Sequence, residues 1–194
     1  FLRQKKGKYR RRHGTKLREK PRELSKKTWI TERPETVNNR SVLGHWEGDT
    51  VKGKTDSGSI ATHVERLSGY ALAAKLDNLT AQHMHQKTVA LFAPVPKHKR
   101  LSETDDNGVE FSDWELTEKQ LNLKHYFALP YHSWERGTNE NFNGLLRQFF
   151  PKGSSFVTVT QKDVDQALYN LNHRPRKRLN YLSPHEVFVK GMKP

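Results

Sequence analysis

Residues 134–151 decide the fold prediction, and they read Trp-Glu-Arg-Gly-Thr-Asn-Glu-Asn-Phe-Asn-Gly-Leu-Leu-Arg-Gln-Phe-Phe-Pro. Apolar residues recur in this stretch at the spacing i, i+3, i+4, i+7, at Phe142, Leu145, Leu146 and Phe149. The spacing predicts an amphipathic helix that begins after Gly137, ends before Pro151 and turns this apolar side towards a core. One carboxylate, Glu140, then lies on the opposite side, where a solvated salt-bridging residue is the usual occupant.

The totals restrict the class of protein. The chain has 194 residues and no cysteine, which predicts one well-buried domain with some extra chain and excludes disulfides and Cys-ligated zinc. No stretch approaches the roughly 20 apolar residues of a membrane span, and no apolar signal segment is present. We therefore expect a soluble, cytoplasmic protein. Because the sequence starts at Phe1 within a basic run, we also expect an upstream part to be missing.

The net charge of +14 is distributed unevenly. Residues 1–40 carry 15 Lys/Arg against 4 Asp/Glu, residues 41–140 carry 11 against 14, and residues 141–194 carry 9 against 3. A basic arm, an acidic middle and a basic tail indicate a protein that binds a polyanion and still gathers carboxylates near it. Nucleic acid is the obvious polyanion, and a nuclease-like metal site would explain the carboxylates.

Two regions are expected. Residues 1–40 form a basic DNA-binding arm or linker, in which Arg10, Arg11 and Arg12 contact phosphates; a localisation signal or a solubilising tail is the alternative. Residues 41–194 form the folded domain. Strands are expected at 43–51, 59–64, 70–76, 100–104 and 124–128, and helices at 78–92, 112–121, 137–150, around 164–171 and from 183. Capping boxes are expected at Ser112 and Ser183. This order predicts an α/β domain with a mixed sheet.

Three carboxylates fall where such a sheet would expose them together. Asp49 lies within the first strand, Asp106 just past the fourth strand, and Glu140 on the helix after the fifth. Carboxylates held together repel one another unless a divalent cation neutralises them, and oxygen ligands suit Mg²⁺.

Several blocks of sequence carry a family resemblance, and they are residues 44–49 (Gly-His-Trp-Glu-Gly-Asp), 106–111 (Asp-Asn-Gly-Val-Glu-Phe), 134–153, 172–177 and 183–188. In this order, and with 33 residues between Asp106 and Glu140, they resemble the bacterial insertion-sequence transposases of the "thirty" type. That family belongs to the superfamily of DDE transposases and retroviral integrases. The resemblance covers roughly residues 30–190 and implies a ribonuclease H-like fold, with a mixed five-stranded sheet flanked by helices.

The resemblance also implies the activity. Asp49, Asp106 and Glu140 would bind two Mg²⁺, with Mn²⁺ able to substitute, and Asp49 would bind both ions. The enzyme would cleave the ends of its insertion sequence and join them to target DNA by transesterification. Double-stranded DNA, both terminal inverted repeats and target, is the implied partner of a homodimer or higher oligomer associated with the bacterial nucleoid. The family's N-terminal helix-turn-helix is not apparent.

Basic and polar side chains near these blocks are candidate DNA contacts, namely Trp134, Arg136, Asn143, Arg147, Lys152, Arg174, Arg176, Lys177 and Arg178. Ordinary helix-surface pairing with Glu140 is the competing explanation for Arg136 and Arg147. Asp105, beside Asp106, is a second candidate for the triad, and Glu135 stands where the family pattern has Gln. Glu47 and Glu110 are expected near the site or on the surface. A non-catalytic DNA-binding relic and a ribonuclease H acting on RNA–DNA hybrids remain as alternative functions.

Overall fold

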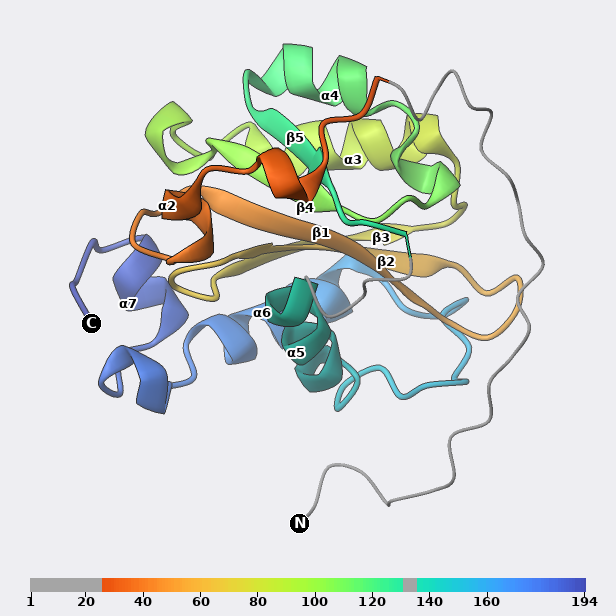
Figure 1. Cartoon of the computed structure of the whole chain (residues 1–194). Helices are drawn as coiled ribbons and strands as arrows, with labels where there is room; N and C mark the ends of the chain where they lie inside the picture. The colour runs from red at the N-terminus through yellow and green to blue at the C-terminus, as the bar shows by residue number, and fades with distance from the viewer. Residues whose placement is uncertain (1–25, 131–135) are drawn as a thin grey trace, which may run out of the picture.

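A mixed five-stranded sheet lies at the centre of the protein (Figure 1), as the sequence predicts. The computed structural model describes residues 26–130 and 136–194. The strand order is β3-β2-β1-β4-β5. The antiparallel part consists of β1 (His45–Lys52), β2 (Ser59–Glu65) and β3 (Ala71–Leu76), and the parallel part adds β4 (Ser102–Asp105) and β5 (Lys124–Phe127) to the other edge of β1. β1 is therefore the strand at which pairing changes from antiparallel to parallel.

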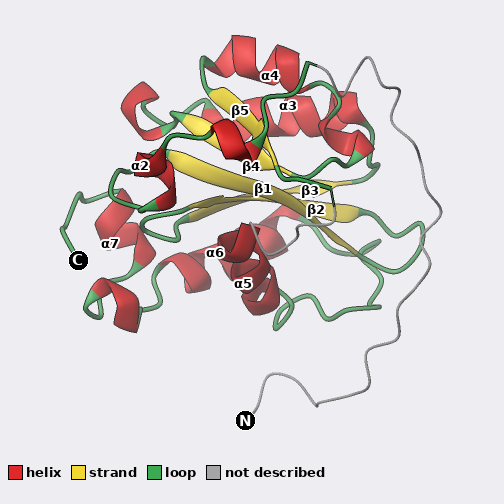
Figure 2. Cartoon of the chain, viewed as in Figure 1, coloured by secondary structure: helices red, strands yellow, loops and turns green. Residues whose placement is uncertain are grey.

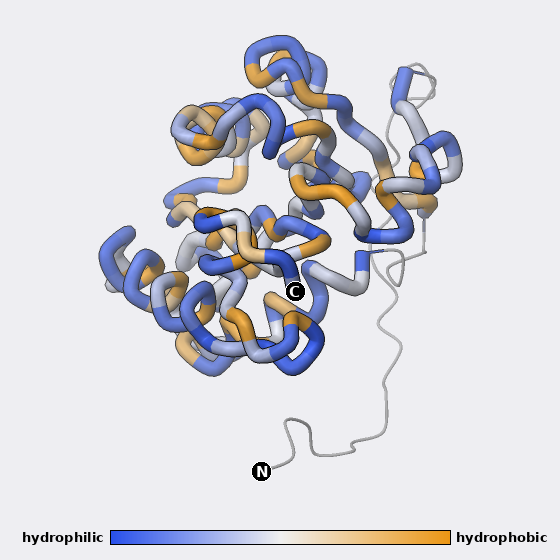
Figure 3. The backbone as a smooth tube through the Cα atoms, turned by 90° about the vertical axis from the view of Figure 1, so that its left-hand side faces the viewer, coloured by the Kyte–Doolittle hydropathy of each residue, from blue (hydrophilic) through white to orange (hydrophobic). Residues whose placement is uncertain are grey.

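Helices cover both faces of the sheet (Figure 2). One face packs against α3 (Ala81–Phe92) and α4 (Trp114–Leu121), and the other against α5 (Gly137–Leu146) and α6 (Gln161–Asn172). Hydrophilic and hydrophobic segments alternate along the helical backbone (Figure 3), the pattern of elements that bury one side. The short elements are η1 (Ile30–Glu32), α2 (Glu35–Asn38), η2 (Lys97–Lys99), η3 (Val109–Phe111), η5 (Lys177–Leu179) and α7 (Pro184–Phe188).

The helix predicted from residues 134–151 is present but shorter, and one predicted core residue is wrong. Phe142, Leu145 and Leu146 are buried in the cluster beneath α5 and α6, whereas Phe149 is 41% exposed and Phe150 is buried instead. The reason is that α5 ends at Leu146 and the chain tightens, since the amides of Gln148 and Phe149 bond to carbonyls three residues back. The tighter turn rotates Phe149 out and Phe150 in.

The two expected capping boxes had different outcomes. At α7 the Ser183 side chain accepts from the Glu186 amide and Glu186 accepts from the Ser183 amide, which confirms the prediction. At α4 the prediction was wrong, because Ser112 continues the turn of η3 and its hydroxyl donates to the Val109 carbonyl at 2.6 Å. Asp113 precedes α4 without a side-chain cap.

Part of the predicted arm is packed against the sheet. The Phe127 amide donates to the Thr28 carbonyl at 2.9 Å, Arg33 donates to the Thr104 hydroxyl at 3.0 Å, and Val37 is buried. Packed structure therefore begins well before residue 40, where the sequence placed the boundary. Sequence reasoning missed this because residues 27–40 lack a long periodic apolar pattern. The basic run with Arg10, Arg11 and Arg12 lies outside the described residues.

Candidate active site

The helix α5 is fixed against β1 by a buried amide. Asn139 is 0% exposed, and its side chain donates to the Glu47 carbonyl at 2.8 Å and accepts from the Thr62 hydroxyl at 3.1 Å. Its backbone amide donates to the Glu47 carboxylate at 2.9 Å, and that carboxylate also pairs with Arg66. Asn139 therefore links α5 to the sheet.

Asp49 lies on the same side of β1 as Glu47, under α5. Its Oδ2 accepts from Asn143 Nδ2 at 2.9 Å, and its Oδ1 accepts from the Thr50 amide at 2.8 Å. Burial raises the pKa of Asp49; Arg136 and the Thr50 amide act against this, while the carboxylates of Asp106 and Glu110 add to it. The Asp49 side chain is 25% exposed, so solvent reaches its carboxylate.

Asp106 follows the end of β4, on the strand next to β1. Its Oδ1 accepts from the Gly108 amide at 2.8 Å, and its side chain is 40% exposed. Asp105, the other candidate for the triad, is the last residue of β4 and is completely buried on the α3 and α4 side, where it pairs with His125. The geometry therefore favours Asp106 beside Asp49.

Arg136 connects the two aspartates. Its guanidinium lies 3.8 Å from Asp49 Oδ1 and 3.4 Å from Asp106 Oδ2, and it also donates to the Gly48 carbonyl at 2.9 Å. Arg136 is the residue immediately before α5 and is only 8% exposed. Its pairing in this structure is with Asp49 and Asp106, and no ion pair with Glu140 forms among the described residues.

Glu140 is exposed on the first turn of α5. It follows Arg136 by four residues and precedes Asn143 by three, so helical geometry places it on the side of α5 that contacts Asp49. Within residues 26–130 and 136–194 it makes no hydrogen bond or ion pair. The structure thus brings Asp49 and Asp106 together and leaves the Glu140 carboxylate free on the adjoining helix face.

A fourth carboxylate, Glu110, lies beside these residues. It is 5% exposed, accepts from the Thr50 hydroxyl at 3.0 Å and lies 3.5 Å from Lys52 Nζ. From the sequence, Glu110 was expected either near the site or on the surface. Its burial beside Thr50 shows that it lies near the site. Its position four residues after Asp106, at the end of the Asp-Asn-Gly block, was the available signal.

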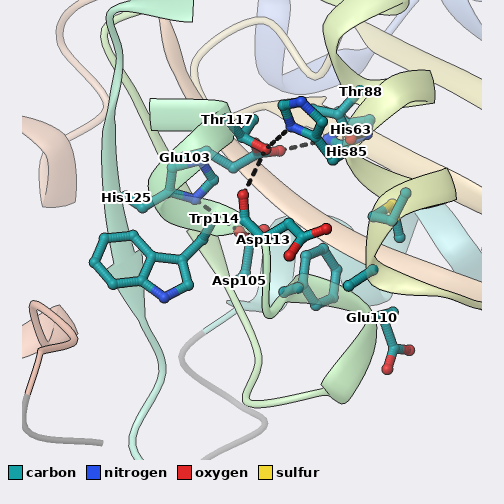
Figure 4. Close-up of a pocket in the computed structure, with 13 residues that line it drawn as sticks. His63, His85, Thr88, Glu103, Asp105, Glu110, Asp113, Trp114, Thr117 and His125 are labelled. Atoms are coloured by element: carbon teal, nitrogen blue, oxygen red, sulfur yellow. Dashed lines mark hydrogen bonds and ion pairs between the residues drawn. The ribbon is translucent and has the colours of Figure 1, made fainter. Parts of the chain in front are cut away.

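The opposite face of the sheet carries a second polar cluster (Figure 4). Glu103, Asp105 and His125 each offer a ligand atom within 4.8 Å of the others, and all three are buried. Burial and the nearby Glu103 charge raise the pKa of Asp105 to about 6, although its hydrogen bond with His125 acts against them. These residues could hold a metal, and sequence reasoning missed the group because it considered Asp105 only as a substitute for Asp106.

Some of the predicted DNA contacts meet at one place. Arg176 and Arg178 line a cavity of ≈ 190 Å³ together with Arg40, beside Thr138 and Asn141 of α5. Lys152, Arg174 and Lys177 are exposed. Arg147 donates to the Lys52 carbonyl at 2.8 Å, and Asn143 is bonded to Asp49 and Thr62, so both already have structural partners. Trp134 lies outside the described residues.

Comparison with known proteins finds similar transposases. The chain is 44% identical over 161 residues to the transposase for insertion sequence element IS4351 of Bacteroides fragilis, covering 82% of this chain and 48% of that protein. It is 39% identical over 165 residues to transposase InsI for insertion sequence element IS30A of Escherichia coli, covering 85% and 43% respectively. The chain therefore spans about half the length of the curated relatives it matches. No family model matches it.

Solved structures with the same fold come from retroviral proteins. The catalytic core domain of BIV integrase superposes with a TM-score of 0.57 at 20% identity, covering 76% of this chain and 94% of that domain. A chain of the simian T-cell lymphotropic virus intasome, solved with the PP2A regulatory subunit B56 gamma, gives a TM-score of 0.64 at 17% identity, covering 77% and 56%. The fold is that of the ribonuclease H-like integrase catalytic cores.

The class is thus a ribonuclease H-like core of the integrase and transposase type. Over the matched residues, the chain is homologous to the insertion-sequence transposases of IS4351 and IS30A. None of the helices among the described residues has the length and apolar character needed to cross a bilayer.

Proposed function

We propose that this chain is the catalytic core of a DNA transposase, which cuts the ends of an insertion sequence and joins them to target DNA. One observation carries the proposal. Asp49 of β1, and Asp106 just past the end of the neighbouring parallel strand β4, lie 3.8 and 3.4 Å from the guanidinium of Arg136, the residue immediately before the helix that carries Glu140. The names of the relatives, transposases of insertion sequences, support the same activity.

The donor set fits a pair of Mg²⁺ ions held by Asp49, Asp106 and Glu140. Hard carboxylate oxygens are the ligands that Mg²⁺ prefers. All three carboxylates are open to solvent to some degree, and the cationic Arg136 side chain lies within 4 Å of both aspartates, which supports a site that attracts positive charge. When bound, the ions would supply Lewis-acid activation of a water or a DNA 3′-hydroxyl and stabilise the leaving oxygen in an in-line displacement at phosphorus.

The protein's own residues would orient this site. Asn143 and the Thr50 amide bond to different oxygens of Asp49, so both fix the direction of the carboxylate. Asn139 and the apolar side of α5 hold the helix against β1, which sets the direction of Glu140. Arg136 carries a charge beside the reacting centre, where a scissile phosphate would be paired.

DNA binding is proposed for the basic segments on both sides of the site. The arm of residues 1–40, of which the last part packs on the sheet, would track phosphates, and the cavity lined by Arg40, Arg176 and Arg178 would receive one. A homodimer or higher oligomer is proposed because two DNA ends have to be held together. Residues 41–194 with the packed segment before them would form the catalytic domain.

The test is metal-dependent cutting and joining of duplex DNA that carries the ends of the element. We expect activity with Mg²⁺ or Mn²⁺, and an Asp49→Asn protein at least about 100-fold slower, because metal-bound charge stabilisation contributes several kcal/mol. Asp77→Asn is the matched control, since Asp77 has an 83% exposed side chain beyond the end of β3. An Asp49→Asn protein as active as the parent would refute the mechanism.

The same preparation separates the alternative functions. A ribonuclease H would cleave RNA–DNA hybrids and leave duplex ends intact. A non-catalytic relic would bind the DNA ends but would cut neither duplex DNA nor RNA–DNA hybrids, whatever metal is added. Either pattern would overturn the proposal.

A further inference from the structure

Four ionisable side chains occupy the face of the sheet that is opposite to Asp49. His63 from β2, Glu103 and Asp105 from β4 and His125 from β5 are each at most 2% exposed. His63 is hydrogen bonded to Glu103, and His125 Nδ1 lies 2.9 Å from Asp105 Oδ2. Figure 4 shows them among the residues that line a small pocket, together with Thr88 and His85 of α3. None of them has a part in the transposition chemistry proposed above.

Two atoms of this cluster lack a hydrogen-bond partner. Asp105 Oδ1 and His125 Nε2 are both buried and unpaired. Each is a polar atom left unpaired in a low-dielectric interior, which is costly. A divalent cation would neutralise both carboxylates and use lone pairs that hydrogen bonds leave empty.

Gly48 lets both carboxylates approach the backbone of β1. A Cβ atom at this position would lie 2.1 Å from Asp105 Oδ1 and 3.0 Å from Glu103 Oε1. The two carboxylate oxygens therefore converge on the same side of β1, over a residue whose missing side chain leaves space for them. The cluster also borders a cavity of ≈ 10 Å³, about the size of one small sphere.

We propose that Glu103, Asp105 and His125 bind a structural divalent transition-metal ion of the zinc class, with His63 holding Glu103 in position. Imidazole together with carboxylate favours zinc over Mg²⁺. In a tetrahedral zinc site the donors lie roughly 3.3 Å apart, given Zn–ligand distances of about 2.0–2.1 Å. Donors already within 4.8 Å of one another would need only a small contraction. The ion would join β4 to β5 behind the proposed active site.

The first test is Zn²⁺ titration of the metal-free full chain, by calorimetry and by metal analysis after dialysis. We expect one tightly bound Zn²⁺ per chain and at least about 100-fold weaker binding in Asp105→Asn, since even outer-shell changes cost 10–100-fold. Asp49→Asn should keep zinc binding, which separates this site from the Mg²⁺ site. His173→Gln should also keep it; the exposed His173 stacks on the half-buried His185, and this pair is the competing zinc site.

If Asp105→Asn does not fold, replacement of Zn²⁺ by Co²⁺ in the unaltered protein tests whether the metal site is tetrahedral. A tetrahedral site in the unaltered protein gives an intense visible absorption band, whereas Co²⁺ on surface carboxylates keeps the weak octahedral spectrum. Absence of bound Zn²⁺, a weak octahedral Co²⁺ spectrum, or loss of zinc in His173→Gln would each overturn the proposal. None of these results depends on transposase activity, so failure here leaves the proposed function to its own test.

Discussion

Replacing Asn139 by Ala tests whether α5 is placed by one buried amide. The change removes the bond to the Glu47 carbonyl at 2.8 Å and the bond from the Thr62 hydroxyl at 3.1 Å, in a side chain that is 0% exposed. Each bond contributes about 1 kcal/mol, and a buried group left without its partner adds about 1 kcal/mol or more. The free energy of unfolding should therefore fall by about 3 kcal/mol.

Urea denaturation of the full chain measures this loss, and Asn141→Ala is the matched control. Asn141 lies two residues further along α5 and is exposed, so its truncation should change the free energy of unfolding by less than about 0.5 kcal/mol. DNA cleavage by Asn139→Ala under folding conditions should also decrease, because Glu140 is no longer held against β1. A loss below about 1 kcal/mol together with parental cleavage would refute the reasoning.

Three further changes test other parts of the structure. Leu146→Asn puts an amide into the cluster under α5 and should cost about 4 kcal/mol in urea denaturation and also reduce cleavage; full strand transfer by a folded variant would contradict this. Arg66→Met leaves the fully buried Glu47 carboxylate without its cation and should cost about 3–5 kcal/mol, so thermal unfolding unchanged from the parent would show that the pair is not needed. Burial, then the charges of Arg66 and Arg33, lower the pKa of His45, so its NMR titration should have a midpoint below 6.5. Between that midpoint and about pH 6.5 the unfolded chain binds a proton that the folded chain does not, so the free energy of unfolding should decrease as the pH falls through this range. A His45→Gln protein should lack this contribution to the slope.

The sequence predicted the longer strands and helices from their apolar patterns, whereas β4 (Ser102–Asp105) contains no apolar residue and was predicted from the turn signal that follows it. The strands from β1 to β5, the helix with Phe142, Leu145 and Leu146, and the α7 cap follow from local patterns. The turn after Leu146 and the docking of residues 27–40 depend on tertiary contacts, which no local pattern records. The buried role of Asn139 could not be predicted for the same reason, because a polar residue on a helix is expected at the surface until its partner Glu47 is known.

The site shows the same division. Spacing and block order singled out Asp49, Asp106 and Glu140, and the structure places the two aspartates beside one arginine, a contact between a strand, a turn and a helix start. The cluster of Glu103, Asp105 and His125 could not be predicted, since its members come from two strands and look like unremarkable polar residues in sequence. Only the parallel pairing of β4 with β5 brings them together.

The single-residue alternation along β1 has an evolutionary consequence. Asp49 points towards α5, and the preceding residue, Gly48, opens towards Asp105 on the other face. Side chains along a strand alternate between the two faces of the sheet. Inserting or deleting one residue within β1 would therefore turn each following side chain to the opposite face. Asp49 would then be driven against Glu103 and Asp105. Homologous strands should therefore vary in composition but not in length at this point, and a deletion scan across residues 46–51 should find no functional variant.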